Sequence, residues 1–146
     1  MKITYRGDYA LKTILDLAMH YGNGPVTIHD MAHRADIPIK FLEQILLDLK
    51  RAGFVKSRRG KIGGYILAKH PSAIKVGDVI RFIDGPIEPI SCVEKKYSGC
   101  KDMHNCAFRE IFKEASKATS RIVDSFNFED LVNKIKAKEI AAVYNI

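Results

Sequence analysis

Three cysteines share one short polar segment, SCVEKKYSGCKDMHNCAF, and are the residues best suited to chemistry. Cys92, Cys100 and Cys106 are separated by seven and then five residues. Thiolates brought together in one loop suit a soft metal centre, and the lysines around them favour the thiolate form and offset an anionic cluster. The segment therefore predicts an iron–sulfur cluster, of either the 4Fe–4S or the 2Fe–2S type.

Two alternatives to a cluster stay open. Zinc could take His104 as a fourth ligand, although structural zinc sites normally have more closely spaced cysteine pairs. A thiol switch without metal is the second alternative. A disulfide scaffold is not expected, because the number of cysteines is odd and the start, MKITYRGDYALK, lacks the apolar core of a signal peptide. We expect a cytoplasmic protein in a reducing compartment.

A second chemical feature is the basic, glycine-rich stretch SRRGKIGGYIL, residues 57–67. Lys and Arg outnumber Asp and Glu by 12 to 6 in residues 1–70, but only by 12 to 11 in residues 71–146. Such a concentration of positive charge favours a polyanion as the partner. The glycines do not follow the order of a P-loop or a dinucleotide fingerprint, which argues against a phosphate-binding enzyme site.

The elements around the basic stretch predict a winged helix-turn-helix. Apolar residues recur at helical spacing over residues 8–20, 28–35 and 38–52, and a tight turn separates the second helix from the third. Thr27 can cap the second helix, and Gly53 can end the third. Residues 55–58 and 65–68 predict two short strands, which form the hairpin of a wing. The apolar stripe expected to pack inward from the third helix consists of Phe41, Leu42, Ile45, Leu46 and Leu49.

The opposite face of the third helix and the wing are the expected DNA-binding surfaces. Polar side chains on a recognition helix can reach base edges, and basic residues on a wing can meet phosphates or the minor groove. Glycines at the hairpin tip would let the backbone approach a groove closely. The residues that we expect to contact DNA are Lys40, Glu43, Gln44, Arg58, Arg59, Lys61, Gly63 and Gly64.

The rest of the chain predicts a dimerisation region. We expect a DNA-binding domain over residues 1–84, a cysteine loop over 85–105, and a dimerisation helix with a final helix over 106–146. Asn127 and Asp130 can cap that final helix. The helix expected over 106–126 is about 30 Å long, too long to be covered fully by so small a domain. A dimer interface is the favoured use, and packing on its own domain is the alternative. Its apolar stripe consists of Phe108, Ile111, Phe112, Ala115, Ile122, Val123 and Phe126.

Enzymes, electron carriers and membrane proteins are not favoured by the sequence. No Ser-His-Asp set or carboxylate pair can be identified, and a ferredoxin-like carrier would need a fourth cysteine. Charged residues interrupt every long apolar run, so no segment reaches the roughly 18 apolar residues of a membrane helix. The expected class is mainly helical with a small hairpin wing, and its expected function is binding rather than catalysis.

Several stretches together resemble the IscR/NsrR-type winged-helix transcriptional regulators, the Rrf2 family, over almost the whole chain. They are ITYRGDYALK, IPIKFLEQILLDLKRAGFVKS, RRGKIGGYILAK and the three cysteines. The resemblance implies a homodimer that crosses through the long C-terminal helix and binds palindromic promoter DNA. It also implies a cluster held by the three cysteines, whose state controls the affinity for DNA, and a wing arginine, Arg59, that enters the minor groove.

The identity of the fourth cluster ligand stays open. IscR-like members carry a histidine three residues after the last cysteine, where this chain has Arg109. NsrR-like members use an aspartate that reaches across from the partner subunit, and Asp8 matches it, although a carboxylate at a helix start can instead cap that helix. His104 or an exogenous group are the other candidates. We expect a repressor that senses nitric oxide, iron or redox state; the alternative is a cluster-free, thiol-dependent or zinc-dependent regulator of the same family.

Overall fold

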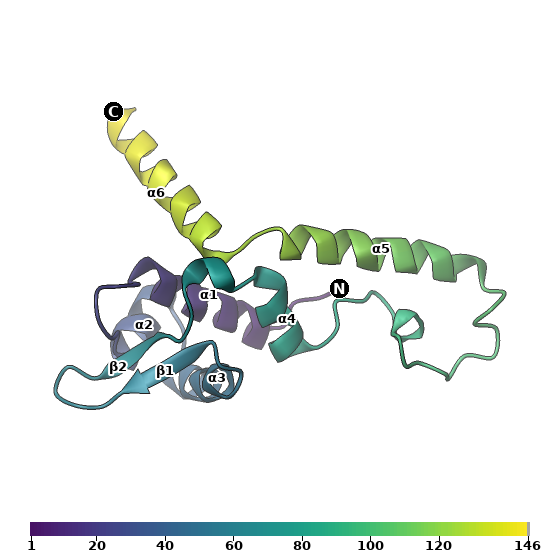
Figure 1. Ribbon diagram of the computed structural model, residues 1–146, viewed down its shortest axis with the longest axis horizontal. Coiled ribbons are helices and arrows are strands. Elements are labelled where there is room, and N and C mark those ends of the chain that lie inside the picture. Colours follow the sequence, from purple (N-terminus) through teal and green to yellow (C-terminus); the bar gives the residue numbers. More distant parts are fainter. Residues whose placement is uncertain (146) are drawn as a thin grey trace.

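The computed structural model describes residues 1–145, and it consists mostly of helices with one antiparallel hairpin (Figure 1). The elements in chain order are α1 (Tyr5–Met19), α2 (Ile28–Ala35), α3 (Ile39–Arg51), β1 (Val55–Arg58), β2 (Gly64–Leu67), the short 3-10 helix η1 (Pro71–Ala73), α4 (Val76–Asp84), the 3-10 helix η2 (Ser91–Val93), α5 (Ala107–Asp124) and α6 (Phe128–Tyr144). The predicted fold class is confirmed.

The core lies where α1 packs against α2, α3, α4 and α6. From α1, Ala10 and Ile14 are fully buried, and from α3, Leu42, Leu46 and Leu49 are fully buried as well. The residues recur at intervals of three and four along each helix, so each helix buries a single apolar face. Truncating one such leucine to alanine typically costs about 2–5 kcal/mol of folding stability. The buried faces of α1 and α3 therefore fix which face of α3 points outward.

The first helix begins earlier than the periodicity of the sequence predicts. Thr4 is its N-cap, because the Thr4 Oγ1 accepts a hydrogen bond from the Gly7 N–H at 3.0 Å. Asp8 does not cap the helix, which corrects that reading of its carboxylate: it lies in the first turn and pairs with Lys12, Nζ to Oδ2 at 2.7 Å. Thr27 caps α2 as predicted, accepting from the Asp30 N–H at 3.2 Å.

The hairpin is joined to the helical core by a third backbone segment. Val55 pairs with Leu67 and Arg58 pairs with Gly64, so β2 starts one residue earlier than predicted. On its other edge, Tyr65 exchanges two backbone hydrogen bonds with Val26, at 2.8 and 2.9 Å. A Cβ on Gly64 would lie 2.4 Å from the Val26 carbonyl oxygen, so only glycine allows the two backbones to come this close.

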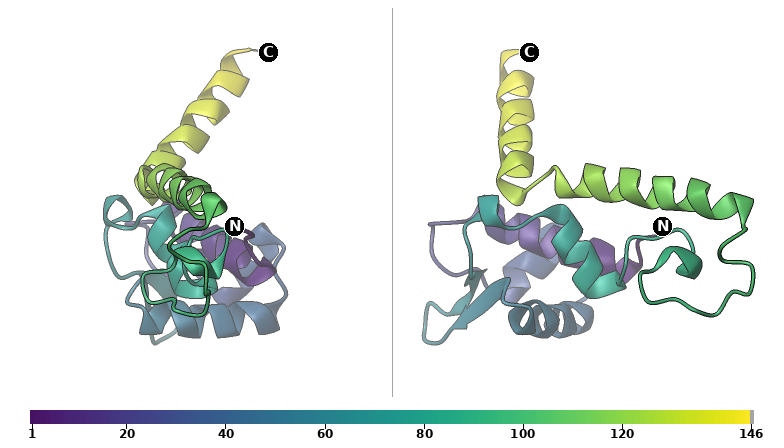
Figure 2. Two further views of the ribbon diagram at one scale, coloured as in Figure 1. Left: turned by 90° about the vertical axis from the view of Figure 1, so that its right-hand side faces the viewer. Right: turned by 45° about the vertical axis from the view of Figure 1, so that its right-hand side comes forward.

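The last two helices leave the domain in different directions (Figures 1 and 2). Their junction is fastened to the domain, because the Val76 N–H donates to the Phe126 carbonyl and the Phe128 N–H donates to the Ile74 carbonyl, at 3.0 and 3.1 Å. Asn127 and Asp130 cap α6 as predicted, and they do so as a reciprocal capping box. Phe126 lies in this junction and not in α5, which ends at Asp124. Within residues 1–145, no helix is long and apolar enough to cross a membrane.

Candidate nucleic-acid interface and cysteine loop

The outer face of α3 presents polar side chains while its inner face packs on the core. Lys40, Glu43 and Gln44 are exposed, as predicted, because they lie opposite Leu42 and Ile45 on the helix. Within residues 1–145 none of the three side chains has a hydrogen-bond or ion-pair partner. All three are therefore free to meet an external ligand, and their donor and acceptor types match base edges in a major groove.

The prediction that Phe41 packs inward with the apolar stripe of α3 is wrong, because Phe41 is 62% exposed. The buried stripe starts at Leu42. Phe41 lies at the edge of this stripe, beside the first turns of α1. Its ring packs against that of Tyr9, with centroids 6.4 Å apart. Together with Tyr5 and Ile45 these rings line an apolar cavity of about 490 Å³. Helical periodicity of α3 could not reveal this cavity, since it depends on where α1 begins and on how its first turns pack beside α3.

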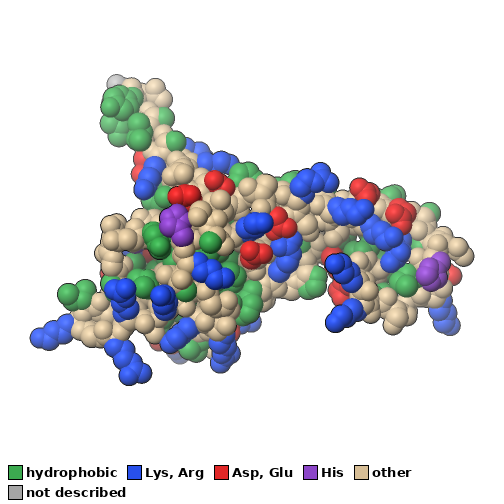
Figure 3. Space-filling model, viewed as in Figure 1, with side chains coloured by type: hydrophobic (Ala, Val, Ile, Leu, Met, Phe, Trp, Pro, Cys, Tyr) green, Lys and Arg blue, Asp and Glu red, His purple; other side chains and the backbone are tan. Residues whose placement is uncertain are grey.

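The hairpin carries the exposed basic residues of the predicted wing. Arg58, Arg59 and Lys61 are exposed, and Figure 3 shows Lys and Arg side chains gathered over the hairpin and α3. Residues 50–61 contain no acid, so nothing in this segment neutralises the charge. Gly63 turns inward instead: a Cβ there would lie 2.7 Å from the Arg58 carbonyl oxygen. The tight closure of the hairpin alone explains this glycine.

Two residues that the sequence did not single out fix α3 against α1. Arg6 of α1 forms an ion pair and a hydrogen bond with Asp48 of α3, and Arg51 lies 3.7 Å from the other oxygen of the same carboxylate. Asp48 is 8% exposed. The Arg6 side chain is half exposed, so its removal would leave the buried Asp48 carboxylate with only the more distant Arg51 as a partner. The contact therefore helps to hold the outer face of α3 in place.

The cysteine loop begins beside the N-terminus of α1. Asp84, the last residue of α4, accepts hydrogen bonds from the Thr4 N–H at 3.0 Å and from the Thr4 hydroxyl at 2.5 Å. A Cβ on Gly7 would lie 2.2 Å from the Asp84 Oδ2, so a side chain there would displace this carboxylate. The loop that follows Gly85 is thus tied at its origin to the helix that carries Asp8.

The loop then runs along α5. The Ser116 hydroxyl donates to the Ile87 carbonyl at 3.1 Å, and the Arg109 Nε donates to the Cys92 carbonyl at 3.3 Å. One oxygen of Glu88 is buried without a hydrogen-bond partner among the described residues. Burial raises the pKa of the Glu88 carboxyl, and the charge of Glu94 raises it further. Sequence reasoning missed this carboxyl, because its burial depends on how the loop packs along α5.

The three thiols do not meet within one chain. Cys92 and Cys106 are half-buried, and Cys100 is exposed. Across residues 1–145 no three or more side chains of His, Cys, Asp and Glu come together as a metal site. His104 is exposed, and Asp8 is paired with Lys12. The donor chemistry suits a soft metal, but this arrangement of a single chain does not fit a cluster, which would require the loop to close or a second subunit to contribute.

Comparison with known proteins agrees with the fold. A family profile described as "Iron-dependent Transcriptional regulator" matches residues 3–134. The regulator CymR of Bacillus subtilis is 34% identical over 146 residues, the full length of both chains. The regulator IscR of Yersinia pseudotuberculosis is 35% identical over 141 residues, 97% of this chain and 85% of that one.

Solved structures lead to the same group of proteins. CymR, described as the global cysteine regulator of B. subtilis, superposes with a TM-score of 0.78 at 35% identity, over 92% of this chain and 98% of that one. T. potens IscR superposes with a TM-score of 0.73 at 32% identity, over 92% and 88%. These relatives are regulators and not enzymes, which confirms the expectation of a non-enzyme. The chain belongs to the Rrf2 family of transcriptional regulators.

Proposed function

We propose that this protein is a homodimeric regulator that binds palindromic promoter DNA through α3 and the wing. One observation carries the proposal: the exposed face of α3 and the basic hairpin lie on one side of the domain, and their cations have no acidic neighbours in residues 50–61 (Figure 3). Lys40 and Gln44 suit base edges, Arg59 suits the minor groove, and Arg58 and Lys61 suit phosphates. Glu43 would be repelled by phosphates, so it would restrict which sites are bound.

The dimer is the second part of the proposal. Large apolar side chains stay exposed on α5, where Phe108, Ile111 and Ile122 are between 61% and 65% exposed. A second copy of the same stripe would cover them about a two-fold axis, and two wings so related would read half-sites about one helical turn apart. A protein that acts on promoter DNA would work in the cytoplasm.

The cysteine loop is the proposed sensing element, and repression controlled by an iron–sulfur cluster is the favoured form. Three thiols flanked by Lys95, Lys96 and Lys101 support it, as does the resemblance to IscR. Cys92, Cys100 and Cys106 would be the ligands, with Asp8 of the partner subunit, His104 or an exogenous group as the fourth. Nitric oxide, iron supply or redox state would be the signal.

A thiol-based regulator without a cluster is the alternative that a specific observation favours. The thiols lie apart in one chain and Cys100 is exposed, which suits a residue that reacts singly and needs no closure of the loop. The resemblance to CymR, a cysteine regulator, also supports it.

The test compares both forms of the protein on its own upstream DNA. The protein is purified anaerobically and reconstituted with iron and sulfide, its visible absorption is recorded, and its Kd for DNA is measured with and without the cluster. We expect visible absorption, its loss in Cys100→Ser, and a changed Kd in the cluster-bound form. A colourless wild type whose Kd responds to thiol oxidation would favour the alternative. A Kd that neither treatment changes would contradict the sensing role of the loop.

A further inference from the structure

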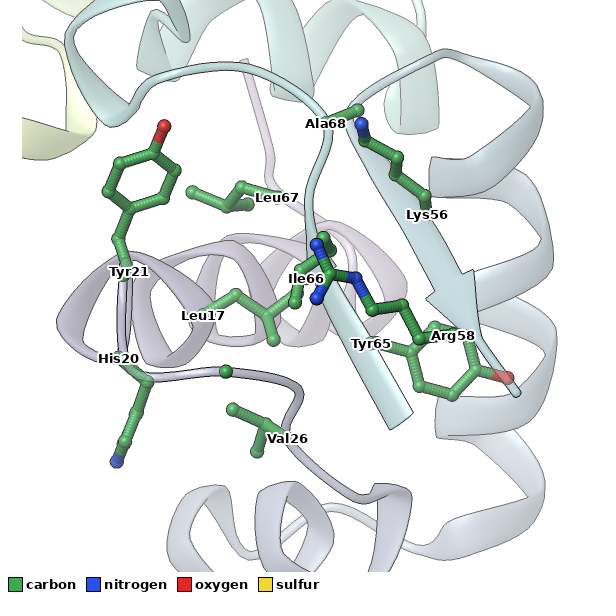
Figure 4. Close-up of a pocket in the computed structure, with 12 residues that line it drawn as sticks. Leu17, His20, Tyr21, Val26, Lys56, Arg58, Tyr65, Ile66, Leu67 and Ala68 are labelled. Atoms are coloured by element: carbon green, nitrogen blue, oxygen red, sulfur yellow. The ribbon is translucent and has the colours of Figure 1, made fainter. Parts of the chain in front are cut away.

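A cavity of about 400 Å³ lies between the hairpin and the turn that joins α1 to α2 (Figure 4). It is separate from the tip of the wing and from the cysteine loop. Gly22 and Gly24 shape the turn on one side, both with positive φ, and the two strands form the other side. The lining residues that matter below are Leu17, Tyr21, Lys56, Arg58 and Ile66.

The charges around this cavity are all positive or neutral. Its lining includes Lys56, Arg58 and His20 but no Asp or Glu. Lys56 lies opposite Ile66 in the hairpin register, and Arg58, two residues along the same strand, shares its face. In Figure 4 the guanidinium of Arg58 points back across β2 toward Ile66, and Lys56 extends toward Ala68.

Neither cation is used within the fold. Among the described residues, Lys56 and Arg58 have no ion-pair or hydrogen-bond partner. Most other arginines of the domain do: Arg6, Arg34, Arg51 and Arg81 each pair with an aspartate. Two unpaired cations that face one concave, acid-free space provide a site for an anionic group, and a guanidinium can hold a carboxylate or a phosphate by two parallel hydrogen bonds.

Apolar side chains form one part of the remaining wall, beside His20 and the backbone of the glycine turn. Leu17, Val26 and Leu67 belong to the buried core, with 2%, 7% and 4% of their surfaces exposed, and the ring of Tyr21 stands beside them. A bare inorganic anion would use only the cations. The volume is within the range of about 300–1,000 Å³ that is usual for small-molecule sites, which combine an apolar lining with a few polar anchors.

We propose that this cavity binds a small organic anion, with its carboxylate or phosphate held by Lys56 and Arg58 and its apolar body against Leu17 and Tyr21. A bound ligand would draw Arg58 away from the phosphates of DNA. It would also brace the turn against the hairpin, beside the backbone pairing of Val26 and Tyr65. The effect on DNA binding rests on the proposed function, whereas the binding site itself does not.

Three related probes test the chemistry of the site: phenyl phosphate, phenol and inorganic phosphate. Binding to the full-length protein is followed by backbone amide shifts in NMR spectra. We expect phenyl phosphate to bind more tightly than either fragment and to shift the signals of Leu17, Tyr21 and Ile66. Arg58→Ala and Lys56→Ala should each weaken its binding about tenfold, as the loss of a charge-assisted contact does. Arg58→Lys should restore part of the affinity.

Lys61→Ala is the matched control, because Lys61 is exposed at the hairpin tip and does not line the cavity. If Lys61→Ala weakens phenyl phosphate binding as much as Arg58→Ala, the probe senses overall charge and the proposal is wrong. Absence of saturable shifts around the cavity at millimolar phenyl phosphate overturns it as well.

A second arm separates this site from the proposed function. Saturating phenyl phosphate should raise the Kd of the wild type for its upstream DNA, while inorganic phosphate at equal ionic strength should not. If the probe binds at the cavity but the protein binds no DNA under any condition, the proposed function fails and the anion site stands. If DNA binds and the bound probe leaves its Kd unchanged, the inferred coupling through Arg58 is wrong.

Discussion

The arginines fall into two groups: some form ion pairs that join elements of the fold, and others have no ion-pair partner within residues 1–145. Arg6, Arg34 and Arg81 each bind an aspartate and hold one element against another. Arg58 and Arg59 at the hairpin have no such partner among the described residues. An exposed cation without a partner in the fold adds little to folding stability. The position of these two arginines at the hairpin, next to α3, is consistent with a contact to a polyanion outside the chain.

Arg59→Ala tests this division directly. Because Arg59 is exposed and unpaired in residues 1–145, its removal should leave folding unchanged and weaken operator binding by about 1–3 kcal/mol. Fluorescence anisotropy with labelled operator DNA measures the change. Lys138→Ala, the same change of charge on the exposed part of α6, should bind as the wild type does. Equal affinity of Arg59→Ala and the wild type would remove Arg59 from the interface.

Gly64 shows how a residue can be required by the fold at a place where the sequence indicates function. The sequence predicts that glycines here let DNA approach, but a Cβ on Gly64 would collide with the backbone of Val26. Gly64→Ala should therefore lower the Tm and expose the Val26 and Tyr65 amides to hydrogen exchange, even without DNA. An unchanged Tm, with weaker DNA binding only, would favour a role at the groove.

At the level of elements, one ion pair restrains the direction in which α5 leaves the domain, together with the backbone bonds of the junction. Arg81 of α4 donates two hydrogen bonds to Asp124 at the end of α5, Nη1 to Oδ1 at 2.7 Å and Nη2 to Oδ2 at 2.8 Å. A bidentate pair restrains rotation as well as distance. The cysteine loop joins the same two helices, so any change of angle between them acts against this pair.

The pair makes a pH-dependent contribution to stability. The hydrogen bonds from Arg81 lower the pKa of the Asp124 carboxyl, so the folded state favours the charged form. The contribution is present above the usual carboxyl pKa and is lost as the pH falls through the lowered one. Asp124→Asn should therefore be less stable than the wild type near pH 7, and the two should converge in acid. The difference should be small, since both side chains are about a third exposed.

Urea unfolding between pH 7 and pH 3 measures this difference. Asp102→Asn is the control, because Asp102 is exposed in the cysteine loop and has no ion pair among the described residues. Its stability should follow that of the wild type at every pH. A constant gap between Asp124→Asn and the wild type across this range would show that the charge of Asp124 does not act as described.

Elements whose ends depend on near neighbours were predictable from the sequence. Thr27 caps α2, and Asn127 and Asp130 cap α6. In both cases the cap and its partner lie within one helical turn of each other. The start of α1 was missed because its cap, Thr4, is stabilised by Asp84, eighty residues away. The exposure of Phe41 and the separation of the three thiols likewise depend on packing between distant segments. The periodicity of the sequence gives no information on such packing.

The molecule as a whole has more apolar helix surface than one chain can cover. In the part of the chain that the structure describes, α5 has no fully buried residue, and its 18 residues extend for about 27 Å (Figure 2). On α6, Phe128 and Val132 pack into the core, while Ile140 and Val143 near its end are 59% and 68% exposed. A second copy that covers this surface would also set the distance between the two wings.

Ile122→Asp tests the whole arrangement. Ile122 is 61% exposed, so aspartate is tolerated in a lone chain, but it would place an unpaired charge inside the proposed interface. We expect Ile122→Asp to sediment as a monomer and to bind operator DNA weakly, because one wing cannot use both half-sites. Lys117→Asp puts the same residue on the opposite face of α5 and should stay dimeric. A dimer that persists in Ile122→Asp, with unchanged DNA affinity, would place the interface on another surface, with α6 as the next candidate.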